Sequence, residues 1–339
     1  MDKRVISVKN LKKKFKVPIK TKSNFIHKII EIFYKKYETK EILHGINFEV
    51  NRGEFIGYLG PNGAGKSTTI KIMTGILIPD SGKIDILGFN PSKQRYKYTF
   101  NIGAVFGHKS LLWYDIPVIE SFKLYKDVYE LNEKEFNERL NFFIDKLKLD
   151  KYLHIPVRKL SLGERMRCEI AASLLHNPKI VFLDEPTIGL DVVAKEEIRN
   201  FLRTINKKEK TTIILTTHDM GDIEELCKRV ILIDEGKIVY DGDLDKLKAK
   251  YVKSKEIKFE FTKLKKKQEF DKLIKQFEII EKTGNYYKLK IDLTKFDVPK
   301  IVKQIMDSCE VIDLNITEPK LEAVMREIYK HQDKIRKQT

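Results

Sequence analysis

The sequence predicts an α/β fold, with a mostly parallel core sheet and helices around it, followed by a smaller α+β domain. Two observations predict the first part. The glycine-rich stretch GPNGAGKST at residues 60–68 runs into the helix-like TTIKIMTGIL. The apolar run from Ile180 to Leu183 is typical of a buried parallel strand. The second part is predicted by strand-like and helix-like segments that alternate after residue 250, with a hairpin between two helices.

The glycine-rich stretch matches the phosphate-loop pattern G-x-x-x-x-G-K-[ST] in full. Its glycines let backbone N–H groups close around phosphate oxygens, where a side chain would obstruct them. Lys66 supplies a positive charge to the β- and γ-phosphates, and the Ser67 hydroxyl reaches Mg²⁺. The pattern therefore predicts ATP and Mg²⁺ as cofactors. The predicted contacts are Gly60, Pro61, Asn62, Gly63, Ala64, Gly65, Lys66, Ser67 and Thr68.

Two carboxylates, Asp184 and Glu185, directly follow the apolar run. At the end of a strand beside a phosphate loop, Asp184 can hold Mg²⁺ through water, and Glu185 can polarise the water that attacks the γ-phosphorus. A solvated acidic turn after a strand is the alternative interpretation, and the phosphate loop argues against it. The pair therefore predicts hydrolysis of the nucleotide as well as its binding.

Four further motifs follow the phosphate loop. They are LSLGE at residues 160–164, LDEP at 183–186, GLD at 189–191 and TTHD at 216–219. Their order resembles that of the ATP-binding subunits of ABC transporters, and the match covers roughly residues 1–245. The resemblance implies an ABC-type P-loop ATPase fold, in which an antiparallel β subdomain and a helical signature subdomain accompany the core sheet. It also implies ATP hydrolysis coupled to transport.

The resemblance further implies roles that one chain cannot fulfil alone. Ser161 and Gly163 belong to the signature that caps the γ-phosphate of an ATP held by the opposite subunit, and Asp191 crosses the seam between subunits. His218 contacts the γ-phosphate and orients Glu185. A serine hydroxyl, glycine N–H groups and a helix N-terminus together form an anion cradle, so ATP can join two subunits. We therefore expect a head-to-tail dimer with a second ATPase subunit.

The sequence departs from the family pattern at two positions. Leu162 stands where the signature usually has glycine, although Gly163, the glycine nearest the phosphate, is present. His108 stands where the family has a glutamine that touches Mg²⁺ and the attacking water. Neutral imidazole can accept a hydrogen bond or approach a metal as the glutamine carbonyl does, but it titrates near neutral pH. Either His108 takes over this catalytic role, or it is a surface loop histidine and the role lies elsewhere.

An aromatic side chain upstream of the phosphate loop should stack on the adenine. The candidates are Phe15 and Tyr37. Read without gaps, the segment YETKEILHG matches the family's aromatic residue, short loop and next strand, which favours Tyr37. Phe15 occupies the same place if residues 16–40 are an insertion. We expect Tyr37 to be the stacking residue.

Positive charge is concentrated near the N-terminus. The net charge is +17, and residues 1–40 hold 13 Lys and Arg against 3 acidic residues. An apolar stripe at helical spacing, flanked by lysines, predicts a basic amphipathic helix over residues 23–37, within an insertion at about residues 16–40. This helix either packs on its own ATPase domain or contacts a permease or the anionic membrane surface.

The chain is expected to divide into an ATPase domain at residues 1–250 and an accessory domain at residues 251–339. The second domain has the order βαββαβ, with Gly284 and Asn285 at a hairpin turn. It closes with a helix whose apolar face includes Leu321, Met325 and Ile328. Regulation, dimer support and passive stabilisation are all open as roles for this domain.

The chain holds no apolar run of the roughly 20 residues that cross a bilayer, so transport requires separate integral-membrane permease subunits. The bulky segment at residues 111–114 either lines a groove for a permease helix or packs in the core. Three widely spaced cysteines predict buried free thiols in a reducing cytosol. We expect the protein at the cytoplasmic face of the cell membrane, held there through the permease.

A soluble ABC ATPase that acts on nucleic acid or the ribosome is the alternative interpretation. Ribosome-acting members usually carry two ATPase cassettes, and DNA-repair members place a long coiled coil between the phosphate loop and the signature. This chain has one cassette, and the interval from Lys66 to Ser161 leaves no room for such an arm. A nucleic-acid partner is therefore not expected.

Overall fold

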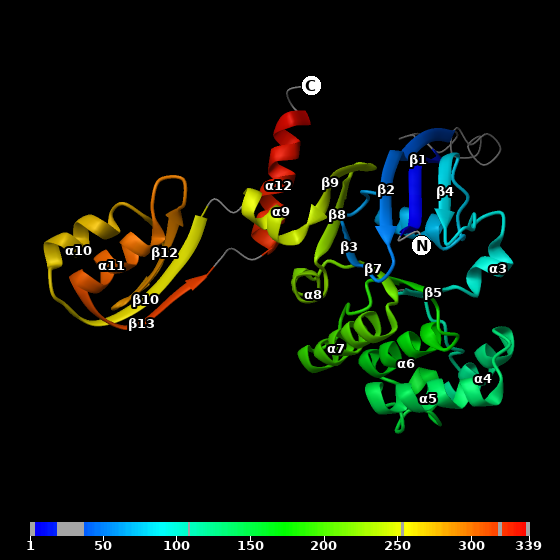
Figure 1. Ribbon diagram of the computed structural model, residues 1–339. Helices are drawn as coiled ribbons and strands as arrows, with labels where there is room; N and C mark the ends of the chain where they lie inside the picture. The colour runs from blue at the N-terminus through cyan, green and yellow to red at the C-terminus, as the bar shows by residue number, and fades with distance from the viewer. Residues whose placement is uncertain (1–3, 19–36, 108, 252–253, 318–320, 337–339) are drawn as a thin grey trace, which may run out of the picture. The chain divides into compact units, whose positions relative to one another are not determined.

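The computed structural model describes residues 4–18, 37–107, 109–251, 254–317 and 321–336. The chain forms two compact units, Met1–Asp243 and Leu244–Thr339. The first unit holds a six-stranded sheet, a three-stranded sheet and a group of helices, whereas the second holds a four-stranded sheet with its own helices (Figure 1).

The core sheet of the first unit has the strand order β5-β6-β7-β3-β8-β9. Its strands are β3 (Phe55–Leu59), β5 (Ile102–Phe106), β6 (Ile180–Asp184), β7 (Thr212–Thr216), β8 (Arg229–Asp234) and β9 (Lys237–Asp243). All neighbouring strands are parallel except β8 and β9. Every residue of β3 and β7 is buried, as expected for strands covered on both faces. Parallel strands end at one edge, so the loops after β3, β6 and β7 meet there.

Strands β1 (Arg4–Pro18), β2 (Tyr37–Asn51) and β4 (Ser81–Ile86) form a separate antiparallel sheet. Strands β1 and β2 pair as far as Pro18 and Tyr37, which lie opposite each other. Residues 16–18 and 37–40, at the two ends of the predicted insertion, are paired strand. Tyr37 begins a strand and does not end a helix. The remainder of the predicted helix, residues 23–36, lies outside the described residues.

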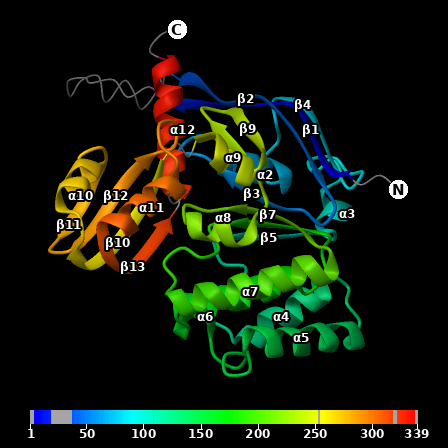
Figure 2. The same cartoon turned by 60° about the vertical axis from the view of Figure 1, so that its left-hand side comes forward.

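The segment between β5 and β6 folds as a helical subdomain. It contains α4 (Val118–Val128), α5 (Glu133–Leu147), the 3-10 helix η1 (Val157–Lys159) and α6 (Leu162–Leu174). Helices α5 and α6 both begin at capping boxes, which satisfy the free N–H groups of their first turns. Figure 2 shows these helices gathered with α7 (Val192–Glu209) below the core sheet. Phe143 and Phe201 join α5 to α7, with ring centroids 6.0 Å apart.

Three shorter helices connect the core strands. Helix α2 (Lys66–Met73) follows β3, α3 (Arg95–Thr99) precedes β5, and α8 (Met220–Leu226) leads from β7 to β8. Helix α2 begins directly after Gly65, and α8 begins directly after Asp219, so the N-termini of both lie at the edge where the strands end. The loops that carry the phosphate-loop and TTHD motifs are thus held between a buried strand and a helix.

The second unit contains a four-stranded antiparallel sheet of order β11-β12-β10-β13. Its elements are β10 (Ser254–Leu264), α10 (Lys267–Ile274), β11 (Glu278–Thr283), β12 (Tyr286–Asp292), α11 (Val298–Ser308) and β13 (Cys309–Thr317). Helices α10 and α11 lie side by side against the sheet (Figure 1). Phe259, Phe270 and Ile305 belong to the core between them. The element order is the predicted βαββαβ.

Two further helices of the second unit, α9 (Leu244–Tyr251) and α12 (Leu321–Arg336), contact each other. Helix α9 buries Leu244 and Leu247, and α12 buries Leu321 and Ile328 on the predicted face. Because this unit starts at Leu244, α9 belongs to it, whereas the sequence-based division at residue 250 assigned α9 to the ATPase domain. The apolar face of α9 packs against a helix that lies much later in the chain, which a local pattern does not reveal.

The three cysteines, Cys168, Cys227 and Cys309, are free and buried, as predicted. Burial raises the pKa of Cys168 to about 12, so this thiol stays protonated at neutral pH. None of the described helices is long and apolar enough to cross a membrane.

Candidate functional site

A cavity of about 640 Å³ lies at the edge where the parallel strands end. It brings together the phosphate loop, the end of β6 and the loop after β7, which are far apart in the sequence. Its lining residues are Phe15, Ile42, Pro61, Asn62, Gly63, Gly65, Lys66, Ser67, Thr68, Asp184, Glu185, Ile188 and His218. Most residues expected to act on one nucleotide therefore face the same space.

Two glycines of the phosphate loop are required by their surroundings. A Cβ at Gly60 would lie 2.2 Å from the carbonyl oxygen of Ile233. Gly65 has a φ of 110°, a conformation that side chains disfavour, and a Cβ there would lie 2.7 Å from Leu43. Gly60 and Ala64 do not line the cavity, and Ala64 is buried. Their predicted contribution to nucleotide contact is thus through backbone shape.

Lys66 is held by hydrogen bonds within the phosphate loop. Its side chain is mostly buried, and Nζ donates hydrogen bonds to the carbonyl oxygens of Gly60 at 2.6 Å and Pro61 at 3.2 Å. Burial lowers the pKa of Lys66, while the carboxylates of Glu185 and Asp184 oppose this shift. The ammonium group is therefore placed among backbone oxygens and two carboxylates at the wall of the cavity.

The two carboxylates after β6 occupy different surroundings. Asp184 ends the strand, and its Oδ1 accepts a hydrogen bond from the Thr216 hydroxyl of β7. Glu185 has a φ of 58°, which is uncommon for a residue with a side chain. Its N–H donates to the Thr216 carbonyl oxygen at 2.9 Å, which holds this backbone conformation. Left-handed residues outside glycine concentrate at functional sites, where surrounding contacts hold them.

His218 touches Glu185 through both its ring and its backbone. The distance from His218 Nε2 to Glu185 Oε1 is 3.3 Å, and the His218 N–H donates to Glu185 Oε2 at 3.2 Å. Both oxygens of this carboxylate are therefore oriented by one residue. The Glu185 side chain is only 13% exposed, whereas His218 is about half exposed toward the cavity. A carboxylate fixed in this way can accept a proton from a water molecule in the cavity.

The donors available for Mg²⁺ are oxygen atoms. Ser67 and Asp184, the two predicted metal ligands, both line the cavity. Among the described residues, no group of three His, Cys, Asp or Glu side chains is placed to hold a metal by itself. Mg²⁺ is typically held by one or two protein oxygens together with substrate phosphates and water, so the residues present fit that ion.

Phe15 lines the cavity, whereas Tyr37, the residue expected to stack on the adenine, does not. Tyr37 lies opposite Pro18 at the far end of the β1–β2 pair and is 56% exposed. Phe15 pairs with Lys40, three positions before Pro18 along β1. Ungapped spacing favoured Tyr37 because it ignored the pairing of the two strands. That pairing places Phe15 beside Ile42 at the cavity wall.

Ser161, Gly163 and Asp191 do not line this cavity. Ser161 caps α6 in a capping box with Glu164, and Asp191 caps α7 by accepting a hydrogen bond from the Ala194 N–H at 2.9 Å. A Cβ at Gly163 would lie 3.3 Å from the Ala194 side chain, so this glycine permits close packing of α6 and α7. Within one chain, all three therefore have structural partners away from the phosphate loop.

His108 lies outside the described residues. The chain just before it is fixed against the two carboxylates, because the Gly107 N–H donates to the Asp184 carbonyl oxygen at 2.8 Å. The chain just after it is fixed by Glu169 of α6, which sequence reasoning missed. Glu169 is buried and accepts hydrogen bonds from the Ser110 hydroxyl and from the Leu111 N–H at 2.7 Å. Burial raises the pKa of Glu169, and these hydrogen bonds oppose the shift.

The bulky segment at residues 111–114 divides between core and surface. Leu112 is buried, whereas Trp113 is 49% and Tyr114 57% exposed. Trp113 lies near Tyr125 of α4, with ring centroids 6.2 Å apart. The alternatives for this segment were core packing and a groove for a permease helix. Leu112 packs in the core, and Trp113 and Tyr114 lie at the surface, where the permease alternative stays open.

Comparisons with known proteins give a consistent result. A family described as ABC transporter matches residues 43–188. The chain is 32% identical over 263 residues to an uncharacterized ABC transporter ATP-binding protein of Methanocaldococcus jannaschii, covering 74% of this chain and 94% of that protein. It is 32% identical over 215 residues to a daunorubicin resistance ATP-binding protein of Streptomyces coeruleorubidus, covering 63% of this chain and 67% of that protein. A solved structure of part of the ABC transporter complex cbiONQ from Clostridium perfringens is similar, with a TM-score of 0.59, 28% identity, and coverage of 73% of this chain and 92% of that one.

Proposed function

Because the chain belongs to the ABC transporter family, we propose that it is the ATP-hydrolysing subunit of an exporter and drives separate permease chains in the membrane. The observation that carries the proposal is the contact of Glu185 with His218 at 3.3 Å in the cavity that Lys66 and Asp184 also line. A binding module without turnover would not need a carboxylate fixed on both oxygens beside a phosphate loop. The arrangement suits attack by water on a terminal phosphate.

The residues expected to act on the nucleotide have distinct roles in this proposal. The phosphate loop and Lys66 bind the β- and γ-phosphates, as in other P-loop ATPases. Ser67 and Asp184 would hold Mg²⁺, which neutralises charge on the phosphate oxygens. Glu185 accepts a proton from the attacking water, and His218 keeps the Glu185 carboxylate oriented toward it. Phe15 stacks on the adenine.

A second copy of the ATPase subunit would complete the site. Ser161 at the N-terminus of α6 offers a hydroxyl at the positive end of a helix, which suits an anion such as the γ-phosphate. Because these groups lie away from the cavity of their own chain, we propose that they face the ATP of the partner in a head-to-tail pair, with Asp191 at the seam. ATP binding then closes the pair, and hydrolysis reopens it.

The permease contact is proposed at the exposed aromatic residues that follow His108. Trp113 and Tyr114 are large and exposed. The backbone just before them is held in place, because Leu112 is buried and the Leu111 N–H donates a hydrogen bond to Glu169. Exposed aromatic side chains of this kind often anchor protein–protein contacts. The similarity to a daunorubicin resistance ATP-binding protein supports export as the direction of transport.

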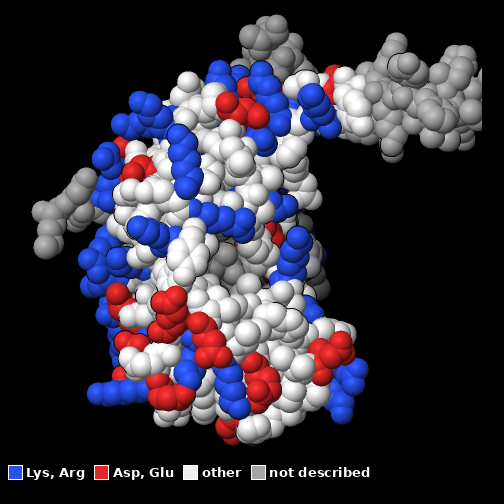
Figure 3. Space-filling view, turned by 90° about the vertical axis from the view of Figure 1, so that its right-hand side faces the viewer, with Lys and Arg blue, Asp and Glu red and all other residues white. Residues whose placement is uncertain are grey.

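Basic side chains support attachment at the cytoplasmic membrane surface. The described part of the N-terminal region exposes Lys9, Lys14 and Lys16. Helix α3 exposes Arg95 and Lys97, and Lys93 is exposed two residues before it. Figure 3 shows the face that carries α3 and α4, where most acidic side chains lie in the lower part and the upper part is mainly basic. Basic groups near anionic lipid each contribute about 1 kcal/mol of attraction. We place the subunit at this surface, held mainly through the permease.

Purification of the tagged full-length chain from membranes of its native host tests the proposal. We expect a polytopic membrane protein to co-purify in stoichiometric amount, and ATPase activity to accompany the complex. Trp113→Ala should reduce the amount of that partner while the isolated subunit still binds ATP. Recovery of the chain with ribosomes or nucleic acid, and without a membrane protein, would overturn the proposed function.

A further inference from the structure

We propose that the buried carboxylate of Asp222 is a positioning residue, which holds Glu185 and His218 in contact by tying together the two loops that carry them. The inference deepens the proposed function, because it concerns the same hydrolytic site. Asp222 belongs to α8 and does not line the cavity. The sequence alone suggests an ordinary acidic residue on a surface helix. It is nevertheless 0% exposed.

One oxygen of Asp222 is shared between the two loops. Asp222 Oδ2 accepts hydrogen bonds from the hydroxyls of Thr187 and, at 3.4 Å, Thr217. Thr187 lies two residues after Glu185, and Thr217 directly precedes His218. Both threonines are 2% exposed, so neither hydroxyl can take water as a ready substitute. The carboxylate therefore fixes the loop after β6 relative to the loop after β7, next to the residues that meet in the cavity.

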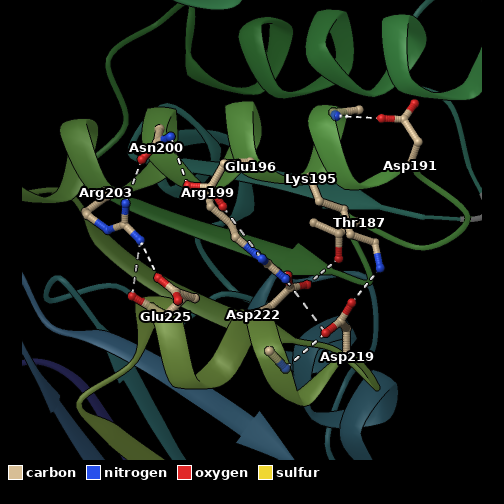
Figure 4. Close-up of polar contacts among 12 residues, drawn as sticks. Thr187, Asp191, Lys195, Glu196, Arg199, Asn200, Arg203, Asp219, Asp222 and Glu225 are labelled. Carbon is tan, nitrogen blue, oxygen red and sulfur yellow. Dashed lines mark hydrogen bonds and ion pairs between the residues drawn. The ribbon is translucent and has the colours of Figure 1, made fainter. Parts of the chain in front are cut away.

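The other oxygen of Asp222 is held by Arg199 of α7. Arg199 donates from Nε to Asp222 Oδ1 at 2.7 Å, and its Nη2 lies 2.6 Å from the same oxygen. Figure 4 shows the guanidinium reaching from α7 to this carboxylate, with Thr187 on the opposite side. A buried charge requires such a partner, because an unpaired carboxylate in a dry interior is costly. With both oxygens engaged, the Asp222 side chain has one defined orientation.

The residue after His218 is tied to the same helix. Asp219 accepts hydrogen bonds from Lys195 Nζ and, at 3.0 Å, from the Gly221 N–H. Arg199 Nη2 lies 3.8 Å from Asp219 Oδ1. The Asp219 N–H in turn donates to the Thr217 hydroxyl at 3.0 Å. His218 is thus flanked by Thr217 and Asp219, which both belong to one network anchored on α7. Figure 4 shows the Asp219 contacts of this network. Its ring nitrogen meets Glu185 because the backbone on either side is held.

The same two helices supply a matched control. Arg203 of α7 pairs with Glu225 of α8 at 3.0 Å, farther along both helices (Figure 4). The Glu225 side chain is 54% exposed, and its described contacts do not involve either loop of the cavity. Breaking this pair removes an α7–α8 ion pair without disturbing Thr187 or Thr217. A difference between the two sites therefore reports on positioning and not on attachment of the helices in general.

Steady-state ATPase assays on the full-length chain, with Mg²⁺-ATP as the substrate, test the proposal. Asp222→Asn keeps the size of the side chain, but the single amide oxygen cannot accept hydrogen bonds from the threonine hydroxyls and from Arg199 at once. We expect kcat to fall on the order of 10-fold or more, since general-base help is worth about 10²–10⁴ and misplacement should forfeit part of it. The KM and the dissociation constant for ATP should change by no more than about twofold, and Glu225→Gln should leave kcat near the wild-type value.

A double-variant cycle separates positioning from a merely structural role. In a Glu185→Gln background, where the carboxylate is already lost, adding Asp222→Asn should lower the residual turnover by less than about twofold. A structural role would lower turnover equally in both backgrounds. Thr187→Val, which removes one hydroxyl without unpairing Arg199, should reduce kcat in the same way and carries the test if Asp222→Asn does not fold.

Unchanged kcat in Thr187→Val and in folded Asp222→Asn would overturn the proposal. So would a double variant in which Asp222→Asn lowers turnover as much in the Glu185→Gln background as in the wild type. These outcomes leave the proposed function intact, because they require an active wild type. Absence of turnover by the wild-type chain, both alone and with its membrane partner, would instead overturn the proposed function and this inference with it.

Discussion

Replacement of Phe15 by alanine should weaken ATP binding, because Phe15 is the aromatic side chain at the cavity wall. Stacking of a base on an aromatic ring is worth about 1–3 kcal/mol, and 1.4 kcal/mol is a factor of ten, so the Kd for ATP should rise roughly 5- to 150-fold. The Phe15 side chain is only half-buried in the protein, so its truncation should cost little folding stability. Tyr37→Ala is the matched control: Tyr37 is 56% exposed and lies outside the cavity.

Equilibrium titration of the full-length variants with ATP and with inorganic tripolyphosphate measures this effect. Tripolyphosphate uses the phosphate loop and has no base, so its affinity should be the same in wild type, Phe15→Ala and Tyr37→Ala. An equal loss of affinity for both ligands in Phe15→Ala would mean that the substitution disturbs the loop and not the stacking. A loss of ATP affinity in Tyr37→Ala alone would restore Tyr37 as the adenine-binding residue and refute the reasoning from strand pairing.

Three further predictions concern the loop, a buried histidine and the aromatic surface. Lys66→Ala should abolish most ATP binding, measured by the same titration, because Lys66 carries the positive charge on the phosphate loop; retained affinity would contradict its role. Burial lowers the pKa of His176 to about 4 from 6.5. Between pH 6.5 and pH 4 the unfolded chain therefore binds a proton at this ring that the folded chain does not bind. The free energy of unfolding should fall by up to about 3 kcal/mol as the pH drops from 6.5 to 4. Urea unfolding across this range should show a smaller slope in His176→Phe, and an unchanged slope would count against the burial effect. Trp113→Ala should leave ATP affinity of the isolated subunit unchanged but reduce recovery of the membrane partner; loss of soluble, folded protein would instead assign Trp113 to the core.

The physical basis of the His176 prediction is the hydrogen bonding of its ring. His176 Nε2 lies 2.9 Å from the Ile102 carbonyl oxygen, so this nitrogen carries the hydrogen in the neutral ring. Nδ1 is buried and has no partner among the described residues. The ring stacks on Tyr129, with centroids 3.7 Å apart and planes 6° apart. Protonation would add an N–H with nothing to receive it, which is why the neutral form is favoured.

Residues in contiguous motifs were predictable from the sequence. Lys66, Asp184 and Glu185 follow directly from local patterns, because a glycine-rich turn before a helix and a carboxylate pair after a buried strand each determine their own geometry. The edge of a parallel sheet then brings them together with His218, and all four line one cavity. The βαββαβ order of the second unit was likewise predictable, since each of its elements has a clear local period.

Other features of the site depend on tertiary pairing, which local patterns do not contain. The choice between Tyr37 and Phe15 depends on the register of β1 and β2, which ungapped spacing does not contain. Asp222 and its partner Thr187 are 35 positions apart, and a single acidic residue on a short helix gives no sign that it is buried. Glu169 was missed for the same reason, because its hydrogen-bond donors, Ser110 and Leu111, are 59 and 58 positions away in the sequence. Local patterns assign residues to elements, whereas these contacts depend on how the elements pack.

The most direct test of the account is the turnover and assembly of Glu185→Gln, which replaces the carboxylate that contacts His218 by an amide of the same shape. ATP binding should be retained, turnover should fall by a factor on the order of 10² or more, and size-exclusion chromatography with ATP should show a dimer that the wild type does not accumulate. Turnover equal to the wild type would contradict the assignment of Glu185 as the group that activates water, and with it the central claim that the contact between Glu185 and His218 is the hydrolytic centre.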